Sequence, residues 1–275
     1  MTDPCARITI TRVRDGVRTP VADAAAVEAP LEIRLQERPF AVIMRTPGAD
    51  RQLVTGFLLA ERLVRSLDDL ATIEHCTDGT GQDDSDREHI IRVVLDERAA
   101  SRALTLLESR RDVMANSACG VCGRSTLESM RDGLAPLQAR PIVKASMLAR
   151  LPERLRASQP LFETTGGLHA AGVFDLQGEL VTAAEDVGRH NAVDKVTGTL
   201  LLQDRLPAAA SVLCVSGRTS YEIVQKAWCA GIPVVASVSA PSSLAVSLAG
   251  EAGIALIGFV RDGGLNIYTG SSLVE

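Results

Sequence analysis

The chain has 275 residues, of which 46% are hydrophobic and only 3% aromatic, and its formal net charge is −5 at pH 7. This length is enough for one large or two ordinary domains, whose cores must be built from Leu, Val, Ile and Ala. The negative charge argues against nucleic acid or an anionic membrane as the main partner, so an anionic ligand must be held by a local group of Arg, Lys and backbone N–H groups.

Residues 1–112 have the pattern of a small α+β domain with a mostly antiparallel sheet. Strands are indicated where apolar and polar side chains alternate or where apolar residues cluster. The predicted strands are 6–14, 31–37, 40–45 and 90–95, and the predicted helices are about 51–65 and about 97–107. Residues 77–88 are acidic and rich in Gly and Ser, which indicates a solvated hairpin tip or a disordered loop.

Residues 113–158 are predicted to form a cysteine-bearing loop followed by linking helices. Cys119 and Cys122 are separated by Gly120 and Val121, in a run that favours neither helix nor strand. The segment after this loop contains helix-like stretches that are punctuated by prolines. We expect it to link the two halves of the chain.

Residues 159–275 alternate strands with helices of about 10–15 residues, which is typical of βαβ units and a largely parallel sheet. The predicted strands are 168–174, 179–183, 211–215, 232–238 and 254–260, with an edge strand at 265–268. The predicted helices are 189–203, 219–230 and 242–252. The second half is therefore expected to be an α/β domain whose ligands bind at the carboxyl ends of its strands.

The two loop cysteines are the strongest chemical signal in the first half. Flanking glycines favour access, and nearby arginines favour the thiolate, so Cys119 and Cys122 are candidates for a nucleophile or a sulfur carrier. Half of a zinc site is an alternative, although a second CxxC pair is missing. A thioredoxin-type dithiol is another, although that motif normally opens a helix. Cys214 and Cys229 lie in apolar runs and are expected to be core residues.

Three polar segments of the second half are candidates for anion binding. Residues 185–195 combine Gly188 with Arg189 and His190 at a predicted helix start, an arrangement that suits a phosphate, although a lone histidine is more often structural. Ser216 and Arg218 follow one buried strand, and residues 239–243 follow the next; ordinary helix capping is the alternative for both.

The third segment follows the last buried strand and is rich in glycine. It is expected either to close over a nucleotide or to be a simple hairpin turn. Its candidate residues are Phe259, Val260, Arg261, Asp262, Gly263 and Gly264. Phosphate-loop, dinucleotide, zinc-protease and serine-hydrolase motifs do not occur, and no histidine begins the HxE signature of zinc deaminases.

Taken together, these motifs resemble the formate dehydrogenase accessory sulfurtransferases, the FdhD family. The resemblance covers most of the chain, and its most specific run is 188–195. The matching segments are 44–48, 56–59, 119–123, 162–171, 185–195, 216–218 and 258–268. The acidic residues 77–88 lie outside them.

The resemblance implies a cytoplasmic sulfur carrier that accepts persulfide sulfur from a cysteine desulfurase and passes it to the molybdenum bis-guanine-dinucleotide cofactor of formate dehydrogenase. It implies that Cys119 holds the persulfide, that Cys122 assists or resolves it, and that the loop 259–264 contacts the cofactor, which guanine nucleotides such as GDP could mimic. It also implies a homodimer, no resident metal, and a cytidine-deaminase-like α/β/α fold for the C-terminal domain. A cofactor-binding chaperone with a structural or zinc-bound CxxC is the alternative.

Overall fold

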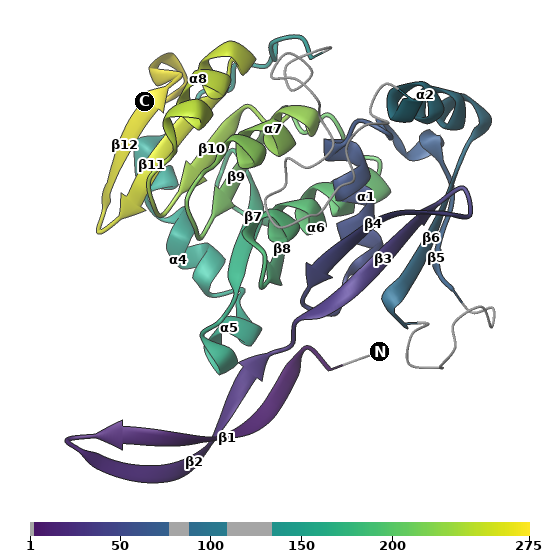
Figure 1. The fold of residues 1–275 in the computed structure, drawn as a ribbon. Coiled ribbons are helices and arrows are strands. Elements are labelled where there is room, and N and C mark those ends of the chain that lie inside the picture. The colour runs from purple at the N-terminus through teal and green to yellow at the C-terminus, as the bar shows by residue number, and fades with distance from the viewer. Residues whose placement is uncertain (1–2, 77–87, 109–133) are drawn as a thin grey trace.

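The computed structural model describes residues 3–76, 88–108 and 134–275 (Figure 1). The strands are β1 (Cys5–Arg14), β2 (Val17–Ala26), β3 (Ala29–Leu35), β4 (Arg38–Arg45), β5 (Leu70–His75), β6 (Ile90–Leu95), β7 (His169–Asp175), β8 (Leu180–Asp186), β9 (Ser211–Val215), β10 (Val234–Ser237), β11 (Ala255–Arg261) and β12 (Gly264–Thr269). The helices are α1 (Asp50–Ala60), α2 (Glu97–Glu108), α3 (Ala145–Leu148), α4 (Leu151–Arg156), α5 (Pro160–Thr165), α6 (Arg189–Leu202), α7 (Tyr221–Cys229) and α8 (Ser243–Ala252). None of the helices in these described ranges is long and apolar enough to cross a membrane.

The N-terminal part contains a four-stranded sheet in the order β4-β3-β6-β5. Two of its strand pairs are antiparallel and one, β3 with β6, is parallel, which confirms the mostly antiparallel prediction. Before this sheet, β1 and β2 form a separate two-stranded hairpin that extends away from the rest of the chain (Figure 1).

The C-terminal part contains a six-stranded sheet in the order β12-β11-β10-β9-β7-β8. Only the central strands β9, β10 and β11 are parallel to one another. β12 is antiparallel to β11, and both β7 and β8 run antiparallel to their neighbours. The prediction of a largely parallel sheet was therefore wrong: the sheet is mixed, because hairpins and not helical crossovers attach its outer strands.

Alternate residues of this sheet are buried on opposite faces, as the period of a strand requires. Leu213, Val235 and Leu256 pack with α6, α7 and α8. Their neighbours Val212 and Val234 pack with the apolar side chains of α3 and α4. The sheet thus lies between two helical layers, and the carboxyl ends of its three parallel strands meet at one edge.

The two halves of the chain join where α1 crosses α6. Both helices have a glycine at the crossing, and a Cβ added to Gly56 would lie 2.0 Å from the carbonyl oxygen of Asp194. One buried hydrophobic cluster contains Leu31 and Leu58 of the N-terminal part together with Val193 and Leu200 of α6. The predicted domain boundaries at residues 112 and 158 remain a prediction. The hydrophobic core around α6 contains residues from both the N-terminal and the C-terminal part of the chain.

Three elements of the N-terminal part differ from the prediction: α1 is shorter than expected, and β2 and β5 were not predicted. α1 ends at Ala60 and not at residue 65, because Arg62 adopts a left-handed conformation with a φ of 62°. β2 was missed because it is rich in alanine and contains Pro20, which strands disfavour. The Asp15-Gly16 pair is the sequence feature that could have predicted the β1–β2 hairpin. Both residues have positive φ, as a two-residue hairpin turn requires. The acidic segment 77–88 falls almost wholly outside the described residues.

Candidate functional site

A cavity of about 820 Å³ opens where the three parallel strands end. Ser216 follows β9, Val238 follows β10 and Val260 lies near the end of β11, and all three line this cavity. Arg156 of α4 and Phe162 of α5 close the opposite side, with the guanidinium carbon of Arg156 lying 4.2 Å from the centre of the Phe162 ring. The cavity therefore combines backbone, cationic and aromatic groups at the sheet edge where ligands were expected.

The glycine-rich segment after β11 is a hairpin turn that borders this cavity. Arg261 pairs with Gly264, and the two residues between them, Asp262 and Gly263, have φ values of 53° and 74°. These angles define a two-residue turn for which Asp-Gly is a favoured sequence. Arg261, Asp262 and Gly263 line the cavity, and the Arg261 guanidinium carbon lies 5.3 Å from the ring centre of Phe259.

A second cavity, of about 380 Å³, lies between the N-terminus of α6 and the N-terminal part of the chain. Arg189 and His190 line it together with Met44 and Phe57. His169, the first residue of β7, lines both cavities. Seven of the ten predicted binding residues are therefore divided between two cavities that share His169, and the other three, Phe259, Gly264 and Arg218, line neither of them.

His169 is surrounded by positive charge. Burial lowers its pKa, and the charges of Arg189 and Arg218 lower the pKa further, while Asp186 opposes them. Gly217 leaves room for His169 and Arg189 to lie close to the backbone after β9, since a Cβ at residue 217 would lie 3.3 Å from Nδ1 of His169 and 4.0 Å from Cδ of Arg189. The Nε atom of Arg189 is buried and makes no hydrogen bond with the described residues. Neutral histidine and arginines in this arrangement suit an anion such as a phosphate or pyrophosphate.

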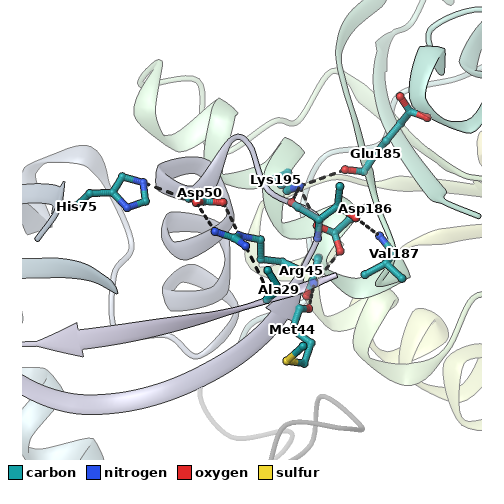
Figure 2. A network of polar contacts seen from close by, with 11 residues as sticks. Ala29, Met44, Arg45, Asp50, His75, Glu185, Asp186, Val187 and Lys195 are labelled. Atoms are coloured by element: carbon teal, nitrogen blue, oxygen red, sulfur yellow. Dashed lines mark hydrogen bonds and ion pairs between the residues drawn. The ribbon is translucent and has the colours of Figure 1, made fainter. Parts of the chain in front are cut away.

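The segment 185–195 divides into structural and cavity-facing residues. Asp186 is fully buried and lies 2.8 Å from the Lys195 ammonium, and its carboxylate accepts hydrogen bonds from the backbone N–H of Thr46 and the Asn191 amide (Figure 2). Lys195 also donates to the carbonyl oxygen of Thr46, and Asn191 donates to that of Met44. These residues attach α6 to the end of β4, so half of this polar motif holds the fold together, whereas Arg189 and His190 line the second cavity.

A second buried ion pair involves Asp194, the residue immediately before Lys195 in α6. The Lys226 ammonium lies 2.6 Å and 2.8 Å from the two carboxylate oxygens of Asp194. Burial raises the pKa of Asp194 to about 6, although the charge of Lys226 acts in the opposite direction. Both residues line the second cavity, and sequence analysis missed Lys226 as a site residue because its partner lies on another helix.

His190 is held by polar neighbours. Its Nε2 lies 3.1 Å from the Ser220 hydroxyl and 3.6 Å from the Glu222 carboxylate. Burial and the charges of Arg189 and Lys226 lower its pKa to about 4. Nε2 of His190 is therefore occupied by neighbours within the fold, as the structural interpretation of this histidine predicts. At pH 7 the His190 side chain is neutral and lines the second cavity.

We expect His190→Gln to become less destabilising as the pH falls. The folded-state pKa of about 4 lies below the unfolded value of about 6.5, so the unfolded chain binds more protons between these values and His190 reduces stability as the pH falls through this window. The variant lacks this penalty. Its stability relative to the wild type should improve by about 1–2 kcal/mol between pH 7 and pH 4.5. Urea unfolding at both pH values measures the difference in unfolding free energy between the variant and the wild type. Asp194 titrates in both proteins, so its contribution cancels. A difference that is the same at both pH values would contradict the prediction.

The serine-rich segments have mixed roles. The Ser216 hydroxyl accepts a hydrogen bond from the backbone N–H of Ala170, so it positions β7 beside β9. Ser242 caps α8 by accepting from the N–H of Ala245, which confirms the capping interpretation there. Arg218 is exposed, and its charge lowers the pKa of His169.

Cys119 and Cys122 lie outside the described residues, and so do all of residues 113–133 of the predicted segment 113–158. Among the cysteines that are described, Cys214 is fully buried, and burial raises its pKa to about 12, which excludes it as a thiolate at neutral pH. Within the described ranges no three His, Cys, Asp or Glu residues are grouped as metal ligands would be. Arg156, Phe162 and His169 are among the cavity residues that the sequence did not single out for binding, because three separate elements bring them together.

The fold and the cavities define an α/β protein with a ligand-sized cavity at the ends of its parallel strands. The FdhD/NarQ family model matches residues 26–275, and the chain belongs to this family.

Curated relatives and a solved structure agree with this assignment. The chain is 45% identical over 268 residues to the sulfur carrier protein FdhD of Streptomyces avermitilis, covering 95% of this chain and 92% of the relative. It is 42% identical to the sulfur carrier protein FdhD of Saccharolobus solfataricus, covering 98% and 97%. A crystal structure from Desulfotalea psychrophila, of a protein assigned as a formate dehydrogenase accessory protein, matches with a TM-score of 0.76 at 24% identity over 99% of this chain and all of the other. This structural match supports the fold.

Proposed function

We propose that this protein is a sulfur carrier that serves the maturation of formate dehydrogenase. The proposal is supported by family membership and by relatives that carry the name sulfur carrier protein FdhD over nearly their whole length. The observation that carries it in the described structure is the cavity at the strand ends, which is bordered by five of the residues that the sequence predicted for binding: Ser216, Val260, Arg261, Asp262 and Gly263.

The sulfur chemistry is assigned to Cys119 and Cys122. The Cys119 thiolate attacks the outer sulfur of a persulfide on a cysteine desulfurase; the donor's sulfur–sulfur bond breaks, the donor thiolate leaves, and Cys119 gains the persulfide. Attack by the Cys122 thiolate on the inner sulfur then forms a Cys119–Cys122 disulfide and releases the outer sulfur as hydrosulfide for the molybdenum centre. A thiol reductant returns the disulfide to two thiols.

The client is proposed to be the molybdenum bis-guanine-dinucleotide cofactor, held as a substrate until it enters the catalytic subunit of formate dehydrogenase. A volume of about 820 Å³ is within the range of small-molecule sites and suits a nucleotide end of the cofactor. The Asp262–Gly263 turn borders this volume. We assign the phosphates of the cofactor to Arg261, which lines this cavity, to Arg189 of the second cavity, and to the exposed Arg218, whose charge reaches His169. GDP is the simplest probe.

A chaperone that holds the cofactor without carrying sulfur is the second candidate. The cavities favour neither the carrier nor the chaperone, because cofactor binding would use the cavity residues and sulfur transfer would use Cys119 and Cys122. A carrier gains sulfur on a cysteine, whereas a chaperone with a structural CxxC does not, and metal analysis would then detect zinc. Sulfur loading and metal content therefore separate the two.

Arg218→Ala is expected to weaken the binding of GDP about tenfold, because one charge-assisted contact to a phosphate contributes about 1.5 kcal/mol. Isothermal titration calorimetry of the full chain measures the change. Arg205→Ala is the matched control, since Arg205 is also exposed but follows the opposite end of α6. Equal affinity of the Arg218 variant and the wild type would remove Arg218 from the site without touching the role of Cys119.

A further inference from the structure

Glu185 belongs to the polar segment 185–195, but its side chain lines neither cavity. Its backbone carbonyl oxygen accepts a hydrogen bond from the Lys195 ammonium at 3.2 Å, so the residue is fixed to the buried Asp186–Lys195 pair. Figure 2 shows the carboxylate of Glu185 pointing away from this pair. The side chain therefore extends from a rigid, buried network toward another part of the fold.

The Glu185 carboxylate caps the first turn of α5. One of its oxygens accepts from the backbone N–H of Leu161 at 3.0 Å, and the other accepts from that of Phe162 at 2.7 Å. Pro160 opens the helix without an N–H, and the N–H of Glu163 already bonds to the carbonyl at the helix start. Both N–H groups that α5 leaves unpaired at its start are therefore satisfied by one charged side chain, and such charge-assisted bonds are strong.

α5 is weakly stable by itself. It is six residues long and none of its residues is buried, whereas isolated helices of this length do not persist in water. The hydroxyl groups of Thr164 and Thr165 donate to carbonyl oxygens one turn earlier in the same helix. On its outer side α5 meets β2, at the base of a two-stranded hairpin that is itself marginally stable (Figure 1). The cap from Glu185 therefore ties α5 to the six-stranded sheet.

α5 forms one wall of the large cavity. Phe162 lines the cavity, and so do Gly166 and Gly167, which follow the helix. The guanidinium carbon of Arg156 lies 4.2 Å from the centre of the Phe162 ring, and the guanidinium also donates to the Glu163 carboxylate at 2.7 Å. The position of α5 therefore sets the position of both planar groups at this wall.

We propose that Glu185 is a positioning residue for the ligand of this cavity. Its cap holds α5 so that the Phe162 ring and the Arg156 guanidinium present a flat stacking surface to a nucleobase. This inference rests on the proposed binding of a guanine nucleotide and adds the place of its base. Planar bases stack on aromatic rings and on guanidinium groups. Arg261, which we assign to the phosphates, lies on the opposite side of the cavity, so the nucleotide spans the cavity between the two walls.

Two probes separate the base from the phosphates, since GDP has both and inorganic pyrophosphate has phosphates alone. In Glu185→Ala we expect the Kd of GDP to rise about fivefold to tenfold, because the stacking surface is displaced, and the Kd of pyrophosphate to stay the same. Isothermal titration calorimetry of the full chain measures both. An equal loss for the two probes would mean that the substitution disturbs the whole site, and would overturn the proposal.

Glu179→Ala is the matched control. Glu179 immediately precedes β8, the strand that contains Glu185, and its exposed carboxylate lies 2.7 Å from the Arg154 guanidinium. Because a surface ion pair contributes little, this variant should bind GDP as the wild type does.

A double-mutant cycle shows whether Glu185 acts through Phe162. Phe162→Ala should weaken GDP binding about tenfold, because the base loses the ring on which it stacks. If Glu185 acts by positioning that ring, adding Glu185→Ala to Phe162→Ala should weaken binding by no more than about twofold further. Fully additive losses would show that the two residues act independently, and would overturn the positioning role.

Hydrogen exchange tests the cap without any ligand. In Glu185→Ala the N–H groups of Leu161 and Phe162 should exchange about tenfold faster or more, while those of α6 keep their wild-type rates. Unchanged exchange in α5 would overturn the proposal. A wild type that does not bind GDP would overturn the proposed client and this inference with it. A wild type that binds GDP, together with a Glu185→Ala variant of equal affinity, would overturn this inference alone.

Discussion

Gly198→Ala is expected to destabilise the protein by about 3 kcal/mol or more, although alanine is the better helix former. A Cβ at Gly198 would lie 1.9 Å from the carbonyl oxygen of Gln52 and 2.7 Å from the backbone nitrogen of Gly56. These are backbone atoms of α1, so no side chain can rotate away, and α1 must move relative to α6. The movement would also strain the contacts of Lys195 and Asn191 with the end of β4.

Gly250→Ala is the matched control for this prediction. Gly250 also lies in a helix, α8, but a Cβ there would meet only the Thr269 methyl group at 3.9 Å. This variant should be neutral or slightly more stable, since alanine loses less conformational freedom. Urea unfolding followed by circular dichroism gives both free energies. Similar stabilities of the two variants would mean that the helix crossing is more adaptable than its geometry indicates.

Cys119→Ala is expected to abolish sulfur loading while leaving the fold intact. After incubation with a cysteine desulfurase and cysteine, intact mass spectrometry of the wild type should show the gain of one sulfur atom, and the variant should show none. The variant should also fail to activate formate dehydrogenase in a strain that lacks the native protein. The loss of sulfur loading should be complete, because the methyl side chain of alanine cannot act as a nucleophile.

Cys5→Ala controls for adventitious loading, since Cys5 is partly exposed, whereas Cys214 is buried with a pKa of about 12. Loading of Cys119→Ala to the level of the wild type would contradict the assigned carrier residue. Absence of loading on every variant, together with bound zinc, would favour the cofactor-holding chaperone. GDP binding should be unchanged in Cys119→Ala. If the sulfur-loading experiment fails, the role of the cavity in nucleotide binding is therefore still tested separately by GDP titration.

Local sequence patterns predicted the elements that form the large cavity. α6 was expected at 189–203 and lies at Arg189–Leu202, because a flexible Gly188 precedes an uninterrupted helical segment. The strands before Ser216 and Val238 were recognised from short apolar runs, and the carboxyl ends of parallel strands necessarily share an edge. The Asp262–Gly263 pair carried its own turn geometry. These features depend on interactions within a few residues.

The sequence by itself therefore determined most of the element types, the sheet edge that holds the cavity and the family motifs. Only the tertiary structure decided that Asp186, Asn191 and Lys195 are structural, because their partners Met44 and Thr46 lie about 140 residues away in the chain. It also decided the direction of the outer strands: periodicity identifies a strand, but its neighbour is selected by how hairpins and helices pack. A local pattern reports which side of a segment is buried, whereas only the packed chain specifies what that side is buried against.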